Sequence, residues 1–306
     1  MVIASRRSPL AQVQAELIGD AYAQYRPDIE VRYRWVEGGA DGDGDPSLEE
    51  TTDKDRFVRG VETLVLNGSA DLAVHSYKDV PITPRADAKG LVVIAVPQRA
   101  DSRDCLIGPS GPMDIDSLPQ GATVGTSSPR RAAQLLRLRP DLSVQKIAGN
   151  VQTRLRLVTE QHRYDATVLA VAGLQRLGLD EFTGAPLDPT VMLPAAGQGA
   201  LAVQCRADDH ATVRRCLPLN DAASAAAVNA ERRVVAALGG GCHHPIGAHF
   251  QTDGDRVRLH ARVLSPDGRR CAEAVESAPP EQDRKLVERV VASLRERGAR
   301  EVLGSD

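Results

Sequence analysis

Residues 2–9, Val2-Ile3-Ala4-Ser5-Arg6-Arg7-Ser8-Pro9, decide the fold, because a short apolar strand passes here through a polar loop into a helix. Ser8 is predicted to be the N-cap of that helix and Pro9 its first residue, since a hydroxyl and a fixed φ suit these two positions. The helix face that packs on the sheet is predicted from apolar residues at helical spacing, namely Leu10, Val13, Leu17 and Ile18.

The same pattern returns at residues 123–131, Thr123-Val124-Gly125-Thr126-Ser127-Ser128-Pro129-Arg130-Arg131, before a helix with apolar Ala132, Leu135, Leu136 and Leu138. A second pair of segments is repeated as well, because Asp71 and Asp165 each lead an apolar strand that follows an amphipathic helix. The later of these two helices is predicted to begin behind the N-cap Asn150. The repeats indicate two lobes in which strands alternate with helices, typical of doubly wound parallel sheets that bind ligands at the strands' carboxyl ends.

Beyond residue 218 the pattern changes. A helix at 222–238 is followed by a glycine break, an alternating strand at 257–263 and a final helix at 281–298. These elements predict a small α+β domain with an antiparallel sheet. The expected fold class is therefore α/β, with two doubly wound lobes, a hinge between them and a small C-terminal α+β domain.

Composition excludes several classes of protein. A chain of 306 residues with 42% hydrophobic and 26% charged residues has enough apolar material for more than one core, which excludes disorder and fibres. A net charge of -3 and 3% aromatic residues argue against nucleic acid as a partner. Apolar stretches are too short to span a membrane, and no apolar signal-peptide core follows the first arginines, so we expect a cytoplasmic protein.

Arginines stand where they oppose a helix dipole. Arg6 and Arg7 precede the first helix, and Arg130 and Arg131 begin a later one, where a cation is unfavourable unless an anion binds. A helix N-terminus with free amides is itself an anion site. The repeated placement predicts a cleft for carboxylates or phosphates, and the alternative is solvated surface arginine.

Lys78 and Asp79 follow an apolar strand at the end where a doubly wound sheet binds its ligand. A carboxylate at that place can accept hydrogen bonds from N–H donors and stabilise a developing cation. The alternative is an ordinary surface ion pair.

Cysteines are odd in number and widely spaced, which indicates neither a disulfide framework nor a zinc knuckle. Cys242 follows three glycines and precedes two histidines, so an accessible thiol here can act as a nucleophile or an attachment point. The others are predicted to be small core residues, namely Cys105, Cys205, Cys216 and Cys271. No metal is expected at Cys242, because adjacent Cys and His ligands converge poorly on one ion. No calcium is expected in the loop at residues 37–56 either. Asp41, Asp43 and Asp45 alternate there, but the Gly and Glu of a calcium loop are missing.

Several segments, taken in order along the chain, resemble the porphobilinogen deaminase (hydroxymethylbilane synthase) family. They are Ile3-Ala4-Ser5-Arg6-Arg7-Ser8-Pro9-Leu10-Ala11, Ala70-Asp71-Leu72-Ala73-Val74-His75-Ser76-Tyr77-Lys78-Asp79-Val80-Pro81, Val124-Gly125-Thr126-Ser127-Ser128-Pro129-Arg130-Arg131, Leu169-Ala170-Val171-Ala172-Gly173-Leu174-Gln175-Arg176-Leu177-Gly178, Leu193-Pro194-Ala195-Ala196-Gly197-Gln198-Gly199-Ala200 and Gly240-Gly241-Cys242-His243-His244-Pro245-Ile246-Gly247. The resemblance implies two lobes like type II solute-binding proteins and a third domain. The implied domains are residues 1–96 with 198–217, residues 97–197, and residues 218–306.

The resemblance also implies a function in tetrapyrrole (haem) biosynthesis. The family's transferases join four porphobilinogen molecules head to tail into hydroxymethylbilane, with release of ammonia and without metal, on a dipyrromethane cofactor that would be attached to Cys242. Asp79 would be the catalytic carboxylate. The cofactor would also be held by Lys78, Asp79, Ser128, Arg130 and Arg131, and the incoming substrate by Arg6, Ser8, Phe57, Arg154 and Arg176. A monomer is the expectation from the family.

Two departures from the family pattern concern activity. Ala148 stands where the family has an arginine, which removes one carboxylate fork from the substrate side, and the lid at residues 37–56 carries extra carboxylates. Two other hypotheses stay open: a non-catalytic or impaired paralogue that binds porphobilinogen or another polycarboxylate, and a plain two-lobed solute-binding or effector-sensing module. The second gives no reason for Cys242 on a glycine loop.

Overall fold

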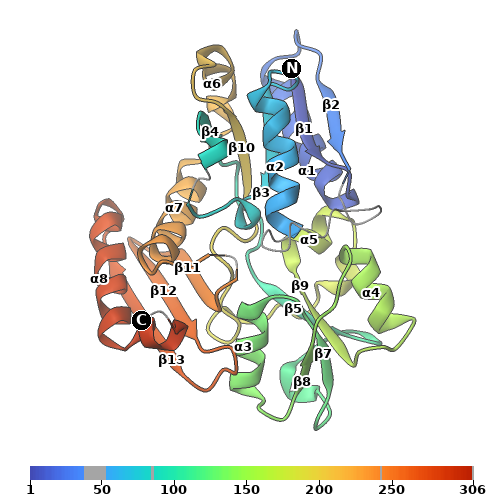
Figure 1. Ribbon diagram of the computed structural model, residues 1–306, viewed down its shortest axis with the longest axis vertical. Helices are drawn as coiled ribbons and strands as arrows, with labels where there is room; N and C mark the ends of the chain where they lie inside the picture. Colours follow the sequence, from blue (N-terminus) through green and yellow to red (C-terminus); the bar gives the residue numbers. More distant parts are fainter. Residues whose placement is uncertain (38–52, 84–85, 242, 305–306) are drawn as a thin grey trace. The chain divides into compact units, whose positions relative to one another are not determined.

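The computed structural model describes residues 1–37, 53–83, 86–241 and 243–304, without the side chains of residues 53–57 (Figure 1). The chain forms two compact units, one made of residues 1–100 and 200–225 and the other of residues 101–199 and 226–306. The finer division into three domains, and the hinge, stay predictions. In the described residues no helix has the length and apolar content needed to cross a bilayer.

The first unit contains one five-stranded mixed sheet. Its strands, in order across the sheet, are β2 (Arg32–Val36), β1 (Val2–Arg6), β3 (Leu72–Ser76), β10 (Leu201–Arg206) and β4 (Leu91–Ala95). Strand β1 runs parallel to both of its neighbours, whereas β10 runs antiparallel to β3 and β4. Helices of this unit include α1 (Pro9–Tyr25), α2 (Asp53–Leu66) and α6 (His210–Cys216).

The second unit contains a five-stranded sheet with the same arrangement of strand directions. Its strands, in order, are β8 (Ser143–Gln145), β7 (Thr123–Gly125), β9 (Ala166–Ala170), β5 (Asp104–Gly108) and β6 (Gly111–Met113). Strand β7 is parallel to both of its neighbours, and β5 is antiparallel to β9 and β6. Helices α3 (Pro129–Leu138), α4 (Val151–Thr159) and α5 (Val171–Arg176) belong to this part of the unit.

The predicted internal repeat is therefore confirmed. In each unit the leading aspartate accepts a hydrogen bond from the backbone at the start of the neighbouring strand: Asp71 Oδ2 from Val2 N and Asp165 Oδ2 from Thr123 N, both at 2.7 Å. The two predicted doubly wound α/β lobes are confirmed, and each of their sheets is mixed and not parallel throughout. Strands β5 and β10 are each the first strand that the chain contributes after leaving the other sheet, so no βαβ crossover fixes their direction.

A three-stranded antiparallel sheet forms the C-terminal part, as predicted. It consists of β11 (Ile246–Asp253), β12 (Arg256–Leu264) and β13 (Cys271–Ala278), and α7 (Ala222–Ala237) precedes it in the chain. Helix α8 (Asp283–Glu296) packs against β12 and β13 (Figure 1). The predicted final helix ends close to Gly298, as expected, because Gly298 is left-handed, with φ 77°. A short further helix that was not predicted, α9 (Ala299–Leu303), follows it.

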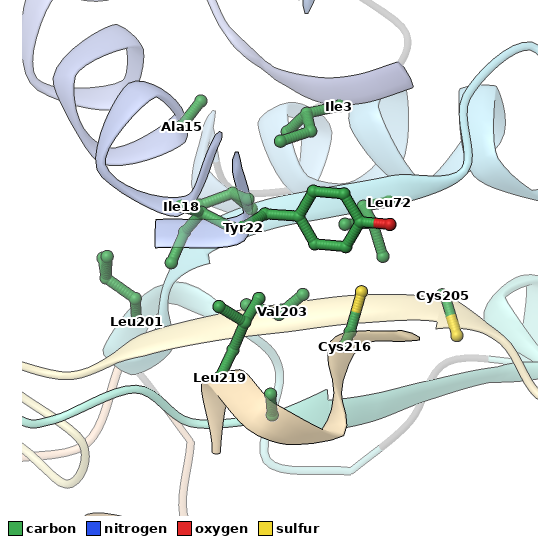
Figure 2. Packing of buried hydrophobic residues seen from close by; sticks show 12 residues of the cluster. Ile3, Ala15, Ile18, Tyr22, Leu72, Leu201, Val203, Cys205, Cys216 and Leu219 are labelled. Atoms are coloured by element: carbon green, nitrogen blue, oxygen red, sulfur yellow. The ribbon is translucent and has the colours of Figure 1, made fainter. Parts of the chain in front are cut away.

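The buried face of α1 differs from the prediction. Ala11, Ala15, Ile18 and Tyr22 face the sheet, whereas Leu17 is 46% exposed. Alanines at this spacing let the helix lie close to the strands, and their small apolar surface gives a weaker sequence signal than leucine does. Figure 2 shows Tyr22 lying across this core beside Ile18 and Leu72.

Three of the four cysteines predicted to be core residues are fully buried, namely Cys105, Cys205 and Cys216 (Figure 2 labels the last two), and Cys271 is half-buried. Burial raises the pKa of the Cys105 thiol to about 12 and that of Cys205 to about 11. Thiols with such pKa values stay protonated near neutral pH and are poor nucleophiles.

Candidate functional site

Strand order in the first unit brings two predicted residues to one edge of the sheet. Arg6 ends β1, and Asp79 lies in a short 3-10 turn, Tyr77–Asp79, directly after β3. Because β1 and β3 are parallel neighbours, their carboxyl ends meet at the same edge. Arg6 is close enough for the charge of Asp79 to act on its pKa.

These residues line a cavity of about 80 Å³. Its polar lining residues are Ser5, Arg6, Ser8, Gln14, His75, Ser76 and Asp79. Drug-sized ligands fill pockets of roughly 300–1,000 Å³. The cavity therefore has room for one substituent of a ligand, such as a carboxylate or the N–H edge of a ring, and not for the whole ligand.

Opposite charges, those of Arg6 and Asp79, line this cavity. Burial lowers the pKa of the Arg6 guanidinium, and the carboxylate of Asp79 opposes that effect only in part. Lys78 is half-buried in the same turn as Asp79. Ser8 is the N-cap of α1, as predicted, but its hydroxyl makes no capping hydrogen bond. Ser8 is also one of the residues that line the cavity.

In the second unit, Arg130 and Arg131 begin α3 and are buried, with 4% and 6% exposure. For these two residues the alternative of solvated surface arginine is wrong, whereas for Arg7 it is right, because the Arg7 side chain is 63% exposed. Both guanidinium groups bind the fully buried carboxylate of Asp104: Arg130 Nη2 donates to Oδ2 at 2.8 Å and Arg131 Nη2 to Oδ1 at 2.7 Å. The anion that the helix dipole argument requires is thus, in part, a carboxylate of the protein itself.

This cluster leaves positive charge uncompensated, because one carboxylate faces two guanidinium groups. The other Nη atoms donate to backbone carbonyls, Arg130 to Leu193 and Arg131 to Val168. Among the described residues, neither Nε atom has an acceptor within hydrogen-bond distance, although both are buried. Ser128, half-buried, caps α3 by accepting from Arg131 N at a long 3.4 Å.

Arg154 and Arg176 also lie in the second unit, in α4 and at the end of α5. Arg154 Nε donates to the carbonyl of Gly149 at 2.9 Å, and Arg176 Nη2 donates to that of Gly199 at 2.7 Å. Burial lowers the pKa of Arg176 to about 10, and no carboxylate of the described residues opposes that shift. A half-buried guanidinium that has no counter-charge among the described residues suits the binding of an anion.

Three predicted features lie wholly or partly outside the described residues. Cys242 is one. Most of the lid at residues 37–56, with its aspartates, is another. Phe57 belongs to α2, but its side chain is not described. Ala148 lies in an exposed loop before Asn150, which caps α4 by accepting from Thr153 N at 2.9 Å. Among the described residues, no group of three or more His, Cys, Asp or Glu side chains could hold a metal ion.

Sequence reasoning missed two residues that organise the second unit. Asp104 begins β5 and receives both arginines, and Gln198 is 1% exposed and donates to Asp104 Oδ1 at 2.8 Å. A signal for Asp104 was present, because a carboxylate that opens a strand of small and apolar residues must find a cation or several donors once buried. Gln198 lies inside the family-like segment at residues 193–200, but nothing in that segment indicated its partner.

Comparison with known proteins agrees with the sequence motifs along most of the chain. The family model "Porphobilinogen deaminase, dipyromethane cofactor binding domain" matches residues 1–214, and "Porphobilinogen deaminase, C-terminal domain" matches residues 225–296. A curated protein named porphobilinogen deaminase from Roseiflexus castenholzii is 44% identical over 269 residues, which cover 88% of this chain and 87% of that protein. One of the same name from Ralstonia nicotianae is 42% identical over 310 residues, which cover 100% of this chain and 91% of that protein.

Similarity to solved structures is weaker. A substrate binding protein of an amino acid ABC transporter matches 71% of this chain and 89% of its own, with 14% identity and a TM-score of 0.38. The family models, in contrast, cover both compact units of the chain. With these matches, the chain belongs to the porphobilinogen deaminase family.

Proposed function

We propose that this chain carries a dipyrromethane cofactor on Cys242 and joins four porphobilinogen molecules to it, head to tail. Water then cleaves the bond to the cofactor, which releases hydroxymethylbilane and returns a proton to the cofactor's α-carbon. Membership of the family supports the reaction, which makes the chain a transferase of tetrapyrrole biosynthesis. The observation that carries the proposal is the cavity in which Asp79 lies beside Arg6, at the carboxyl ends of two parallel strands.

The chemistry of each addition suits these residues. The protonated aminomethyl group of porphobilinogen leaves as ammonia, and the electrophilic methylene that results bonds to an α-carbon of the growing pyrrole chain, which then loses a proton. The cofactor, when bound, supplies the first such α-carbon. The carboxylate of Asp79 would accept hydrogen bonds from pyrrole N–H groups and stabilise the positive charge that develops as the amine leaves.

Arginine forks account for the acetate and propionate groups that every pyrrole carries. On the substrate side we assign Arg6, Ser8, Arg154 and Arg176, with Phe57 as a packing residue. On the cofactor side we assign Lys78, Ser128, Arg130 and Arg131. The residues fit a polycarboxylate for two reasons. One carboxylate faces two guanidinium groups in the Asp104 cluster. Among the described residues, no carboxylate opposes the lowering of the pKa of the half-buried Arg176.

Intact mass of the purified protein, measured together with turnover, tests the proposal. We expect an added mass of two linked pyrrole units in the chain without substitutions and none in Cys242→Ser. Cys271→Ser, which removes a half-buried thiol elsewhere, is the control and should carry the added mass. With porphobilinogen, the loaded chain should release ammonia and hydroxymethylbilane in a four-to-one ratio. A chain that stays unmodified after incubation with porphobilinogen or hydroxymethylbilane would contradict the proposal and favour a binding paralogue.

We further infer a cytoplasmic monomer with no nucleic acid partner. The family's pathway supports the compartment, and a net charge of -3 with 3% aromatic residues supports the absence of nucleic acid. Light scattering on the loaded protein checks the oligomeric state, where a mass near 32.7 kDa is expected and twice that mass would contradict it.

A further inference from the structure

A tight turn at residues 195–199 ends the first of the two segments that make up the second unit, residues 101–199. Gln198 N donates to the carbonyl of Ala195 at 2.9 Å, and the glycines on both sides of Gln198 are left-handed, with φ of 78° at Gly197 and 85° at Gly199. Such φ values are strained for residues that carry a Cβ. The two glycines therefore let the chain reverse sharply around the buried side chain of Gln198.

The Gln198 side chain fastens this turn to the start of β5. Its Nε2 donates to the carbonyl of Ser102 at 2.7 Å and to Asp104 Oδ1 at 2.8 Å, so both amide hydrogens have acceptors. Asp104 is in turn fixed by Arg130 and Arg131. A buried amide in such a network has one position, because any shift leaves polar atoms without partners.

The other side of the turn is fastened from the C-terminal part of the same unit. Gly197 N donates to Glu231 Oε2 at 2.8 Å, and Glu231 Oε1 accepts from Phe250 N at 2.9 Å. The carboxylate on α7 thus bridges the turn and strand β11. The turn is held from both sides by hydrogen bonds to charged groups, which are among the stronger ones in proteins.

Gly199, the last residue of the turn, presents its carbonyl to Arg176. The distance from Arg176 Nη2 to that oxygen is 2.7 Å. Within the part of the chain that the structure describes, this is the one hydrogen bond that the Arg176 guanidinium makes, although it carries five N–H donors. The direction of the guanidinium plane therefore depends on where the turn holds the Gly199 carbonyl.

We propose that Gln198 is a positioning residue for substrate binding: it fastens the turn to Ser102 and Asp104, and the Gly199 carbonyl then orients Arg176 toward a carboxylate of the incoming pyrrole. This inference rests on the proposed function, in which Arg176 binds substrate. Nothing in the reaction requires Gln198 to touch the substrate, so its effect should be seen in KM and should disappear when Arg176 is absent.

Gln198→Met tests this, because methionine fills the space without donating a hydrogen bond. We expect KM for porphobilinogen to rise about fivefold to tenfold, the size of effect that the loss of one ordinary hydrogen bond has. The kcat should stay within about twofold, and the cofactor mass should stay complete. Gln204→Met is the matched control, since Gln204 is also buried and donates to a carboxylate, Glu62 Oε1, at 3.0 Å in the other unit. This control should leave KM unchanged.

A double-mutant cycle separates positioning from general damage. In an Arg176→Met background, adding Gln198→Met should raise KM no further, whereas a full additional rise would overturn the inference. An unchanged KM in the single variant would overturn it too. If Gln198→Met does not fold, as judged by circular dichroism, Gln198→Asn keeps the donors on a shorter side chain and should show a smaller rise of KM. Lack of turnover in the unmodified, loaded chain would instead contradict the proposed function.

Discussion

Two aspartates of this chain have opposite surroundings and therefore opposite uses. Asp104 is fully buried, and its two oxygens accept from Arg130, Arg131 and Gln198. A carboxylate satisfied in this way holds structure together and has no capacity left for a ligand. Asp79, in contrast, lines a cavity beside Arg6, where a ligand can reach it. Position relative to a cavity, and not residue type, distinguishes the two roles.

Asp79→Asn should lower kcat for hydroxymethylbilane formation by about 100-fold or more, because the amide keeps the shape but loses the charge that stabilises a developing cation. The thermal midpoint should change little. Asp20→Asn, which alters an exposed carboxylate of α1 in the same unit, serves as the control and should keep full activity. A rate within a few-fold of the unmodified chain would contradict the assignment of Asp79.

Ala148→Arg should raise kcat/KM by about threefold to tenfold, since it restores a guanidinium fork on the substrate side. The site is an exposed loop, so the longer side chain displaces no core residue. Ala148→Met, of similar length but without charge, is the control and should give no gain. Equal kcat/KM in all three proteins would show that another cation already supplies the missing contact.

At the scale of elements, sequence patterns predicted the positions of strands and helices well, because apolar periodicity and N-cap residues are local signals. Ser8, Ser128 and Asn150 all stand at helix starts as expected. Burial of Arg130 and Arg131 could not be predicted, because their partner Asp104 comes from a strand 26 residues earlier. The anchors of Gln198 are also non-local, since its partner Asp104 is 94 residues away in the chain. Local patterns thus predicted the helices and strands, whereas the polar cluster around Asp104 depends on residues far apart in the chain.

The N-cap side chain makes a capping hydrogen bond in α4 but not in α1, so its contribution to stability should differ between the two helices. Asn150→Ala should cost about 1 kcal/mol of unfolding free energy, because Asn150 Oδ1 accepts from Thr153 N at 2.9 Å. Ser8→Ala should cost less than about 0.5 kcal/mol, since the Ser8 hydroxyl makes no capping bond. Urea denaturation of both variants checks this. Equal losses would mean that Ser8 does cap α1 in solution.

The C-terminal sheet should contribute acid sensitivity. Glu273 on β13 bonds to His260 at 2.6 Å and to Arg262 at 2.7 Å, and these contacts lower the pKa of its carboxyl from 4.5 to about 2. A carboxylate with a lowered folded-state pKa stabilises the fold above its unfolded pKa, and that stability is lost as the pH falls toward the folded value. The lost stability belongs to the window from about pH 4.5 to 2.

Glu273→Gln should therefore cost about 1–2 kcal/mol near neutral pH and progressively less as the pH falls through that window. Urea midpoints near pH 6 and near pH 3 measure the change. Glu276→Gln is the control, because Glu276 is exposed and lies 3.8 Å from Arg289. Its substitution should change the free energy of unfolding little, and by the same amount at both pH values. A loss for Glu273→Gln that is the same at both pH values would contradict the assigned window.

For the whole molecule, a net charge of -3 conceals arginines of low exposure in each unit: Arg6 and Arg176 are half-buried, and Arg130 is buried. Burial lowers the pKa of Arg6, Arg130 and Arg176, which means that the folded chain holds these charges at a cost. Asp104 and Asp79 offset only part of that cost. A bound polycarboxylate would offset more, so occupancy and stability should be linked.

Cys242→Ser, which cannot hold the cofactor, should therefore unfold at a temperature about 5 °C or more below that of the loaded chain, the size of shift that a few kcal/mol produces at this length. Differential scanning calorimetry at low salt measures the two midpoints, and added salt should narrow the gap because it screens the arginine–carboxylate attraction. Cys271→Ser, a half-buried thiol outside the proposed site, is the control and should stay near the loaded chain. Equal midpoints for the loaded chain and Cys242→Ser would show that Arg6, Arg130 and Arg176 are already neutralised within the protein. The stability of the fold would then be independent of polycarboxylate binding.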